Sequence, residues 1–127
     1  MKNEESQLQQ RCIRLFATIY PHLWDAKRIH AIPNGGHRSP QTAITLKREG
    51  TRAGVWDIQL TIPRGPYAGL WIEMKVGRNG LTDEQKAFML SHKDDYSFAV
   101  CRSEAEFLEA IRGYLALPVR VIYPSNI

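Results

Sequence analysis

The chain of 127 residues carries a net charge of +4, with 43% hydrophobic and 24% charged residues. This length predicts one domain spanning 1–127, and the composition excludes disordered, collagenous and coiled-coil classes. Its apolar runs are shorter than the roughly 20 residues of a bilayer span, and its polar start lacks a signal-peptide core, so we expect a cytoplasmic protein without membrane contact. Cys12 and Cys101 lack metal-ligand spacing and are expected to be buried free thiols.

The basic charge is concentrated in the first two thirds of the chain. Residues 1–80 carry twelve Lys or Arg and six Asp or Glu, whereas residues 81–127 carry five and seven. One-sided basic charge is typical of proteins that bind a phosphate backbone, because each neutralised phosphate releases counterions. The same pattern also fits a solvated cationic face, and charge alone does not separate the two.

Hydrophobic spacing and turn residues predict the order α-β-α-β-β-α-β-α, an α/β fold with a mixed central sheet flanked by helices. The expected elements are a helix over 4–20, a strand over 28–32, a helix over 40–47, strands over 55–62 and 68–76, a helix over 83–92, a strand over 96–101 and a final helix after 103. Capping boxes are expected at Thr82 with Gln85 and at Ser103 with Glu106. The segment 119–123 is either a short edge strand or an arm packed on a partner chain.

The central hairpin can be registered by arithmetic, because a loop centred on Gly65 pairs residues whose numbers sum to 130. This register pairs Trp56 with Met74, Ile58 with Ile72, Leu60 with Leu70 and Ile62 with Ala68, which makes one face apolar. Asp57 then lies opposite Glu73 on the other face, and Lys75 points the same way two residues further on.

Two carboxylates that face each other across a hairpin repel unless a cation neutralises them. Mg²⁺ or Mn²⁺ suits such oxygen ligands, and Lys75 beside the ion would orient a water and offset charge on an attacked phosphodiester. Asp57, Glu73 and Lys75 therefore indicate a metal-dependent hydrolase site for nucleic acid. The alternative is a surface patch in which Glu73 and Lys75 form an exposed pair worth less than about 1 kcal/mol.

Two further polar residues point toward the same region. At 100° per residue, Glu5 falls within the apolar stripe of the first helix, formed by Leu8, Cys12, Leu15, Phe16 and Ile19. Gln85 lies on the inward side of its own helix. Each has a simpler interpretation, since Glu5 would favour the positive end of a helix dipole and Gln85 would complete a capping box.

Several short motifs in the sequence resemble those of a known family. They read ESQLQ at 5–9, IPNGGHR at 32–38, GTRAGVWD at 50–57, IEMK at 72–75 and GLTDEQ at 80–85. With these motifs the sequence resembles the VRR-NUC family of the PD-(D/E)XK nuclease superfamily, in particular its small stand-alone members from phages and bacteria. Trp56 replaces the usual proline before the aspartate, and we expect it to face the apolar side of the hairpin.

The resemblance implies a restriction-endonuclease-like core and cleavage of DNA phosphodiesters with Mg²⁺ or Mn²⁺. It implies that Glu5, Asp57 and Glu73 are the acidic residues that bind the metal in the catalytic site, and that the Met74 carbonyl is a further metal ligand. Lys75 would position the water, and Gln85 would lie near the scissile phosphate. Stand-alone members look like homodimeric Holliday-junction resolvases, so the implied partners are branched or junction DNA and a second copy of the chain.

A turn followed by basic residues is the expected DNA-backbone surface. Its residues are Asn34, Gly35, Gly36, His37, Arg38, Lys47, Arg48 and Arg52. The alternative is an ordinary turn beside a solvated basic helix. No helix-turn-helix, zinc finger or aromatic platform suggests base reading, so selectivity would follow DNA shape.

A two-fold dimer would supply two cleavage sites for a four-way junction. Trp24 and the segment 118–127 are the apolar candidates for the subunit contact. The competing functions are a non-catalytic DNA-binding or scaffold module on a nuclease core, a flap- or fork-specific nuclease, and a restriction-type nuclease that reads duplex sequence.

Overall fold

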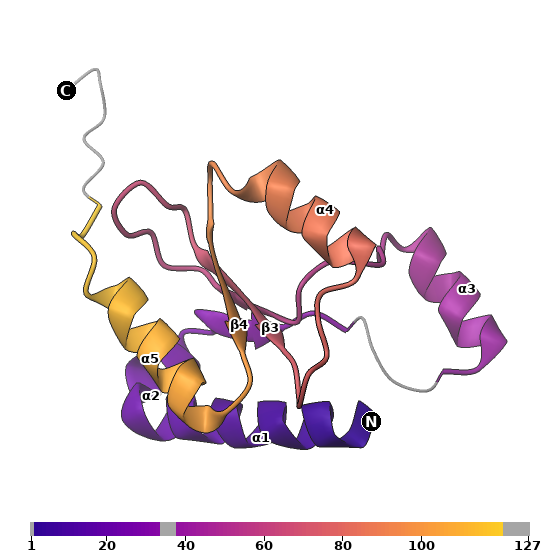
Figure 1. The fold of residues 1–127 in the computed structure, drawn as a ribbon, viewed down its shortest axis with the longest axis horizontal. Coiled ribbons are helices and arrows are strands. Elements are labelled where there is room, and N and C mark those ends of the chain that lie inside the picture. Colours follow the sequence, from indigo (N-terminus) through magenta and orange to yellow (C-terminus); the bar gives the residue numbers. More distant parts are fainter. Residues whose placement is uncertain (1, 34–37, 121–127) are drawn as a thin grey trace.

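The computed structural model describes residues 2–33 and 38–120, where the chain forms five helices and four strands (Figure 1). In chain order these are α1 (Lys2–Ile19), α2 (Pro21–Asp25), β1 (Ile29–Ala31), α3 (Pro40–Arg48), β2 (Ile58–Leu60), β3 (Leu70–Met74), α4 (Asp83–His92), β4 (Ser97–Cys101) and α5 (Glu104–Leu115). None of the helices in these two ranges has the length and apolar composition needed to cross a membrane.

The four strands form one mixed sheet in the order β1-β2-β3-β4. The β2–β3 hairpin is antiparallel with Ile58 opposite Ile72 and Leu60 opposite Leu70, so the register predicted from the sum of residue numbers is confirmed. β3 and β4 are parallel, and α4 provides the crossover that a parallel pair requires. The predicted mixed sheet flanked by helices is therefore confirmed.

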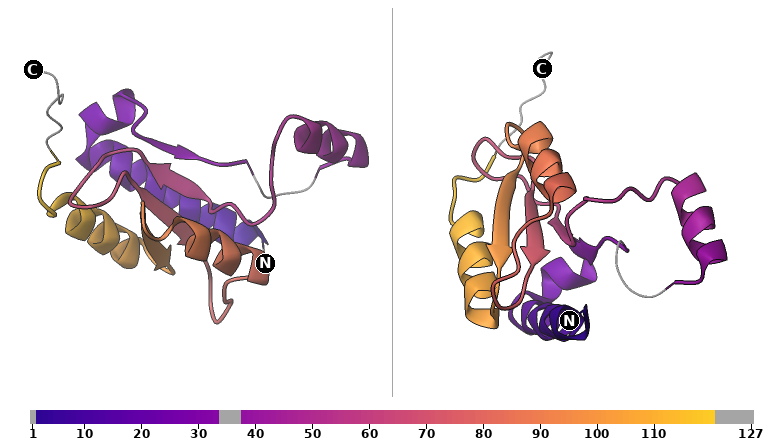
Figure 2. Two further views of the ribbon diagram at one scale, coloured as in Figure 1. Left: turned by 90° about the horizontal axis from the view of Figure 1, so that it is seen from above. Right: turned by 45° about the vertical axis from the view of Figure 1, so that its right-hand side comes forward.

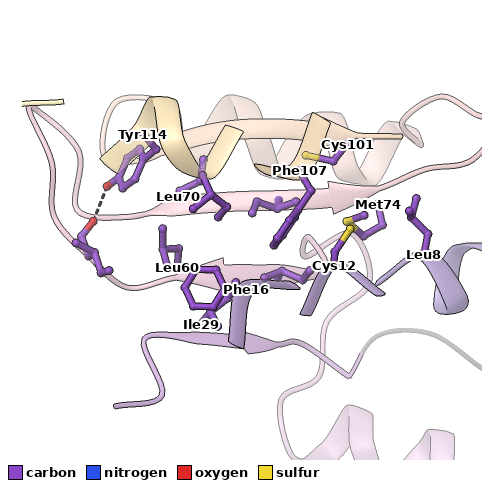
Figure 3. Close-up of a cluster of buried hydrophobic side chains, with 14 residues drawn as sticks. Leu8, Cys12, Phe16, Ile29, Leu60, Leu70, Met74, Cys101, Phe107 and Tyr114 are labelled. Carbon is purple, nitrogen blue, oxygen red and sulfur yellow. Dashed lines mark hydrogen bonds between the residues drawn. The ribbon is translucent and has the colours of Figure 1, made fainter. Parts of the chain in front are cut away.

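The main hydrophobic core lies between the sheet and the helices α1 and α5 (Figure 3). Leu8, Cys12 and Phe16 of α1 are buried there, as the helical spacing predicts. Ile19 was expected in the same stripe but is 41% exposed, because α1 ends at this residue. The ring of Tyr20 instead packs on Phe16, with centroids 5.1 Å apart.

Helix α4 covers the opposite face of the sheet, over β3 and β4 (Figure 2). Its Phe88 packs edge-on against Trp71 of β3 at 5.1 Å and against Phe98 of β4 at 6.1 Å. Because helices cover both of its faces, all five residues of β3 are buried. The charged face of the hairpin therefore lies beneath a helix rather than in solvent.

Two local predictions need correction. Pro21 was expected to end the first helix, but it also begins the short helix α2, because proline is favoured at the first helical position. The Ser103 hydroxyl caps α5 by accepting from the Glu106 amide at 3.1 Å. The reciprocal half of that capping box does not form, since the Glu106 carboxylate accepts instead from the Arg102 amide at 2.8 Å.

The C-terminal segment makes one isolated β-bridge, between Val119 and Arg64. This contact involves the first residue of the strand predicted over 119–123. Residues 121–127 lie outside the described part, so the arm and the subunit contact predicted there remain predictions.

A buried hydroxyl ties α5 to the end of the hairpin. Tyr114 is 4% exposed, and its hydroxyl donates a 2.6 Å hydrogen bond to the Ile62 carbonyl (Figure 3). Tyr114→Phe should lower the free energy of unfolding by about 1–2 kcal/mol, because the carbonyl loses its partner in a buried place. Urea titration measures this change. Tyr96→Phe is the control, with less than about 0.5 kcal/mol expected; an equal effect in both variants would contradict the assignment.

Candidate active site

The end of the hairpin brings Asp57 and Glu73 together. Asp57 immediately precedes β2, and its amide donates to Glu73 Oε1 at 3.2 Å. In return, Asp57 Oδ2 accepts from the Met74 amide at 2.9 Å. The Asp57 carboxylate thus accepts the Met74 amide of β3, in the place of a backbone carbonyl from a neighbouring strand. Each acidic side chain is held by a hydrogen bond to the backbone at or next to the other residue.

Lys75 joins this pair as the third predicted member. Its Nζ lies 3.5 Å from Glu73 Oε2, and the two side chains are only 8% and 4% exposed. A buried ion pair differs from the solvent-exposed pair of the alternative interpretation, because burial of charge requires a compensating arrangement. The structure therefore places a positive charge and two carboxylates in one cluster, in which Glu73 and Lys75 are buried and Asp57 is half-buried.

Gln85 both completes the capping box of α4 and points toward the carboxylate cluster. Its side-chain oxygen accepts from the Thr82 amide at 3.0 Å, which completes the predicted capping box of α4. Its Nε2 donates to Glu73 Oε2 at 2.9 Å. One side chain therefore fixes the start of α4 and orients the Glu73 carboxylate.

Glu5 approaches the cluster from α1. Its carboxylate accepts from Asn79 Nδ2 at 3.4 Å, and its charge is one of the factors that raise the pKa of Asp57. The partner Asn79 was not anticipated from the sequence. Within residues 2–33 and 38–120, no three His, Cys, Asp or Glu side chains converge as a metal-holding group, so Glu5 does not form one with Asp57 and Glu73.

The two central carboxyl groups are both shifted toward the protonated form. Burial, reinforced by the charge of Asp57, raises the pKa of Glu73 to about 8, against the opposing influence of Lys75. Burial also raises the pKa of Asp57, although the hydrogen bond from the Met74 amide acts in the other direction. Two such groups held together are poised to ionise when a cation arrives.

The donor set fits a hard divalent cation. The groups at the cluster are the carboxylate oxygens of Asp57 and Glu73 and the adjacent backbone of Met74, and no thiol or imidazole is among the residues predicted as metal ligands. Oxygen ligands with one or two carboxylates are the usual environment of Mg²⁺ and Mn²⁺. The pKa values of Asp57 and Glu73 are raised because their negative charges are removed from water and lie close together, and a bound cation would neutralise that charge.

Trp56 does not face the side that the alternation predicted. Its ring lies 4.9 Å from Phe98, edge-on, and its Nε1 donates to the Gln85 carbonyl at 3.0 Å, which places it under α4. The prediction was wrong because β2 begins only at Ile58, so strict alternation does not extend back through Asp57. The indole thereby connects the residue before Asp57 to the helix that carries Gln85.

The same loop approaches α4 at Gly54. This residue has a φ of +89°, and a Cβ there would lie 2.8 Å from the Glu84 carbonyl oxygen. Only glycine accommodates both the backbone conformation and this contact. A glycine two residues before Trp56 is the sequence signal that could have revealed the close packing of this loop on α4.

Trp56→Phe should lower the free energy of unfolding by about 1–2 kcal/mol, because the Gln85 carbonyl loses the indole donor. The matched control is Trp71→Phe, since the Trp71 Nε1 is buried without a partner in the described structure. Both changes remove a similar volume from the α4 interface, so their difference isolates the hydrogen bond. Urea titrations of the two variants measure it; equal losses would show that this hydrogen bond does not stabilise the contact with α4.

The predicted DNA-backbone residues fall on and around α3. Figure 2 shows this helix set apart from the sheet and the other helices. Ser39 caps it by accepting from the Thr42 amide at 3.1 Å. The exposed residues of the set are Lys47, Arg48 and Arg52, while the Arg38 guanidinium donates to the Pro33 carbonyl. Asn34, Gly35, Gly36 and His37 lie outside the described residues.

Comparison with solved structures shows what the chain is similar to. No family model matches the sequence, and no curated protein matches it. A solved structure described as a VRR_NUC domain protein superimposes with a TM-score of 0.70 at 29% sequence identity. The match covers 91% of this chain and 90% of that one, so the likeness includes the hairpin and both helical layers.

Proposed function

The resemblance to the VRR-NUC family of PD-(D/E)XK nucleases is thus confirmed, and on this premise we propose that the chain is a divalent-metal-dependent DNA endonuclease. The observation that carries the proposal is the pair of Asp57, which is half-buried, and Glu73, which is buried, with Lys75 at 3.5 Å from Glu73. Two adjacent carboxylates with raised pKa values are hard to explain by stability, because they disfavour the metal-free fold.

Each residue of the cluster has a distinct role in the proposal. Asp57, Glu73 and the Met74 carbonyl hold the ion, and Glu5 adds negative charge from α1. When bound, Mg²⁺ or Mn²⁺ supplies a Lewis acid for the phosphate and lowers the pKa of water. Lys75 positions the attacking water and offsets the charge that develops on the phosphate. Gln85 holds Glu73 in place beside the scissile phosphate.

The proposed substrate is branched DNA, bound through its backbone. Lys47, Arg48 and Arg52 offer exposed positive charge on the segment that leads to Asp57. Backbone contacts fix position without reading sequence, which favours recognition by shape. A homodimer with two cleavage sites would suit a four-way junction, in the manner of a Holliday-junction resolvase.

A panel of labelled substrates tests this function. Purified protein is incubated with a four-way junction, a flap, a fork, a single strand and a linear duplex, with Mg²⁺ and then Mn²⁺. We expect cleavage of branched substrates, which Asp57→Asn and Lys75→Met each abolish without loss of folding. Salt-sensitive binding with no cleavage in either metal would overturn the proposal in favour of a non-catalytic module, and cuts at fixed duplex sequences would indicate a restriction-type enzyme.

The proposed dimer is tested separately by sedimentation. The expected result is a mass of two chains at micromolar concentration, both free and on a four-way junction. A single chain under both conditions would contradict the two-site arrangement while leaving the nuclease proposal intact.

A further inference from the structure

A groove of about 770 Å³ runs along the outer edge of the sheet, where α1, α2 and β1 meet. Its apolar lining comes from Ile13 of α1 and from Ile29 and Ala31 of β1. Trp24 of α2 also lines it and is 40% exposed, so its ring is accessible to a ligand in the groove. In Figure 1 helices α1 and α2 lie on the side of the sheet away from α4.

The outer edge of β1 borders this groove. The Arg28 carbonyl accepts from the Thr61 amide and the Ile32 amide donates to the Asp57 carbonyl, both at 2.7 Å. In an antiparallel pair, alternate residues bond to the partner strand, so the amides and carbonyls of Ile29 and Ala31 point away from β2. Ile29 is 2% exposed and Ala31 is exposed, so the groove combines an aromatic surface with the backbone edge at Ala31.

The positively charged residue Lys27 lines the groove and lies in a turn at the end of α2. The Lys27 amide donates to the Trp24 carbonyl and the Arg28 amide to the Leu23 carbonyl, each at 3.0 Å, which is the Schellman arrangement at a helix end. Lys27 has a φ of +59° at the position where glycine is usual. The fold thus keeps a lysine at the rim in a conformation that glycine would adopt more readily.

Lys27 is joined at the rim by an imidazole and a carboxylate. The Nδ1 of His30 lies 3.4 Å from the Lys27 carbonyl oxygen, and both residues line the groove with Asp25. A lysine ammonium group and an imidazole N–H donate to phosphate oxygens, whereas a carboxylate accepts from the amino group of a base. The lining therefore has partners for each part of a nucleotide.

We propose that this groove binds an unpaired stretch of the DNA substrate, with a base stacked on Trp24 and its phosphates at Lys27 and His30. The inference rests on the proposed nuclease function and adds the substrate class, a branched DNA with a single-stranded arm. β1 leads directly from the groove to the site, because Ile32 bonds to Asp57 and lies three residues, or about 10 Å, beyond Ile29.

A second copy of the chain, which Trp24 was expected from sequence to contact, fits the groove less well. Strand β1 has only three residues, so edge pairing between two copies would form few hydrogen bonds. Lys27 and Arg28 are both exposed beside the edge and would repel their counterparts across a two-fold axis. Positive charge at the rim favours a polyanion over a second basic chain.

Tryptophan fluorescence tests the proposal directly, because Trp24 is exposed whereas Trp56 and Trp71 are 1% and 8% exposed. Titration is done with a single-stranded oligonucleotide and with a blunt duplex in EDTA, so that binding is measured without cleavage. The single strand should quench the wild-type fluorescence and leave that of Trp24→Ala unchanged. Equal quenching in both proteins, or none in the wild type, would overturn the proposal.

Affinities from the anisotropy of a labelled single strand give the second readout. Trp24→Ala should weaken binding by roughly 5- to 100-fold, as expected for loss of one stacked base, while Trp24→Phe retains most of the affinity. Leu90→Ala, which changes another exposed apolar residue, is the control without effect. Unchanged affinity of Trp24→Ala, or a dimer that dissociates in this variant, would assign the groove to another occupant.

Lys27→Gly separates binding from structure. This change suits the left-handed backbone, so the unfolding midpoint should not fall, yet the slope of log affinity against log salt should decrease by roughly one unit. An unaltered salt slope would overturn the role of Lys27. The binding measurements are made in EDTA and so do not depend on cleavage. Quenching in a protein that cleaves no substrate with a metal would refute the nuclease proposal and leave the proposed binding groove intact. Cleavage without quenching would refute the binding groove and leave the nuclease proposal intact.

Discussion

Glu73→Gln should produce a protein that is more stable than the wild type at pH 8 in EDTA and has lost cleavage by roughly 10³-fold or more. The stability gain follows from burial, which with the charge of Asp57 raises the pKa of Glu73 to about 8. A neutral amide of nearly the same shape removes this repulsion, and we expect that gain to exceed the cost of the acceptor that Gln85 Nε2 and Lys75 Nζ lose. The loss of activity follows because glutamine cannot hold a divalent ion as a carboxylate does.

Thermal unfolding and initial cleavage rates on a branched substrate measure the two effects in one preparation. Glu109→Gln is the matched control, since Glu109 is exposed on α5 and its substitution should change neither quantity. A Glu73→Gln protein that is destabilised at pH 8, or that still cleaves at a comparable rate, would show that Glu73 is a structural residue. Such opposite effects on stability and activity are typical of functional residues.

The metal-free protein should lose stability as the pH rises from 5 to 8. In the unfolded chain Glu73 releases its proton near the ordinary glutamate value of 4.5, whereas in the folded chain its pKa is raised to about 8 and it retains the proton until then. The folded state thus binds more protons across this interval, so its stability falls with a slope of up to about 1.4 kcal/mol per pH unit for one group. The raised pKa of Asp57 acts in the same direction.

Added Mg²⁺ should reverse this loss, and more strongly at pH 8 than at pH 6, because the ion competes with protons for the same carboxylates. Urea titrations at each pH, with EDTA or with Mg²⁺, measure the slope and its reversal. Glu73→Gln should flatten the slope and remove most of the metal effect. An identical pH slope in wild type and variant would place its origin elsewhere in the chain.

Much of the site could be predicted because its geometry is set locally. The alternation of the hairpin fixes a register in which Ile58 pairs with Ile72. Asp57 directly precedes Ile58, so the same register brings it beside Glu73, where hydrogen bonds to the Glu73 carboxylate and from the Met74 amide hold it. The periodicity of α1 turns Glu5 toward the sheet. The spacing of Thr82 and Gln85 predicts a capping box, which also delivers the Gln85 amide to the cluster.

The features that escaped prediction depend on contacts between distant segments. Trp56 bonds to the Gln85 carbonyl across 29 positions of sequence, and no local pattern indicates on which side of the sheet α4 lies. The burial of Lys75 and the raised pKa of Glu73 follow from that same helix. The groove at Trp24 likewise requires α2, whose five residues are too few for a periodic signal.

The central claim is that Asp57 and Glu73 bind one divalent ion between them. Crystals soaked in Mn²⁺ and measured at a wavelength where manganese scatters anomalously test it most directly. The account predicts an anomalous peak at roughly 2.0–2.3 Å from one oxygen of each carboxylate, and its disappearance in Asp57→Asn. Manganese bound elsewhere on the protein, with no peak between these two side chains, would contradict it.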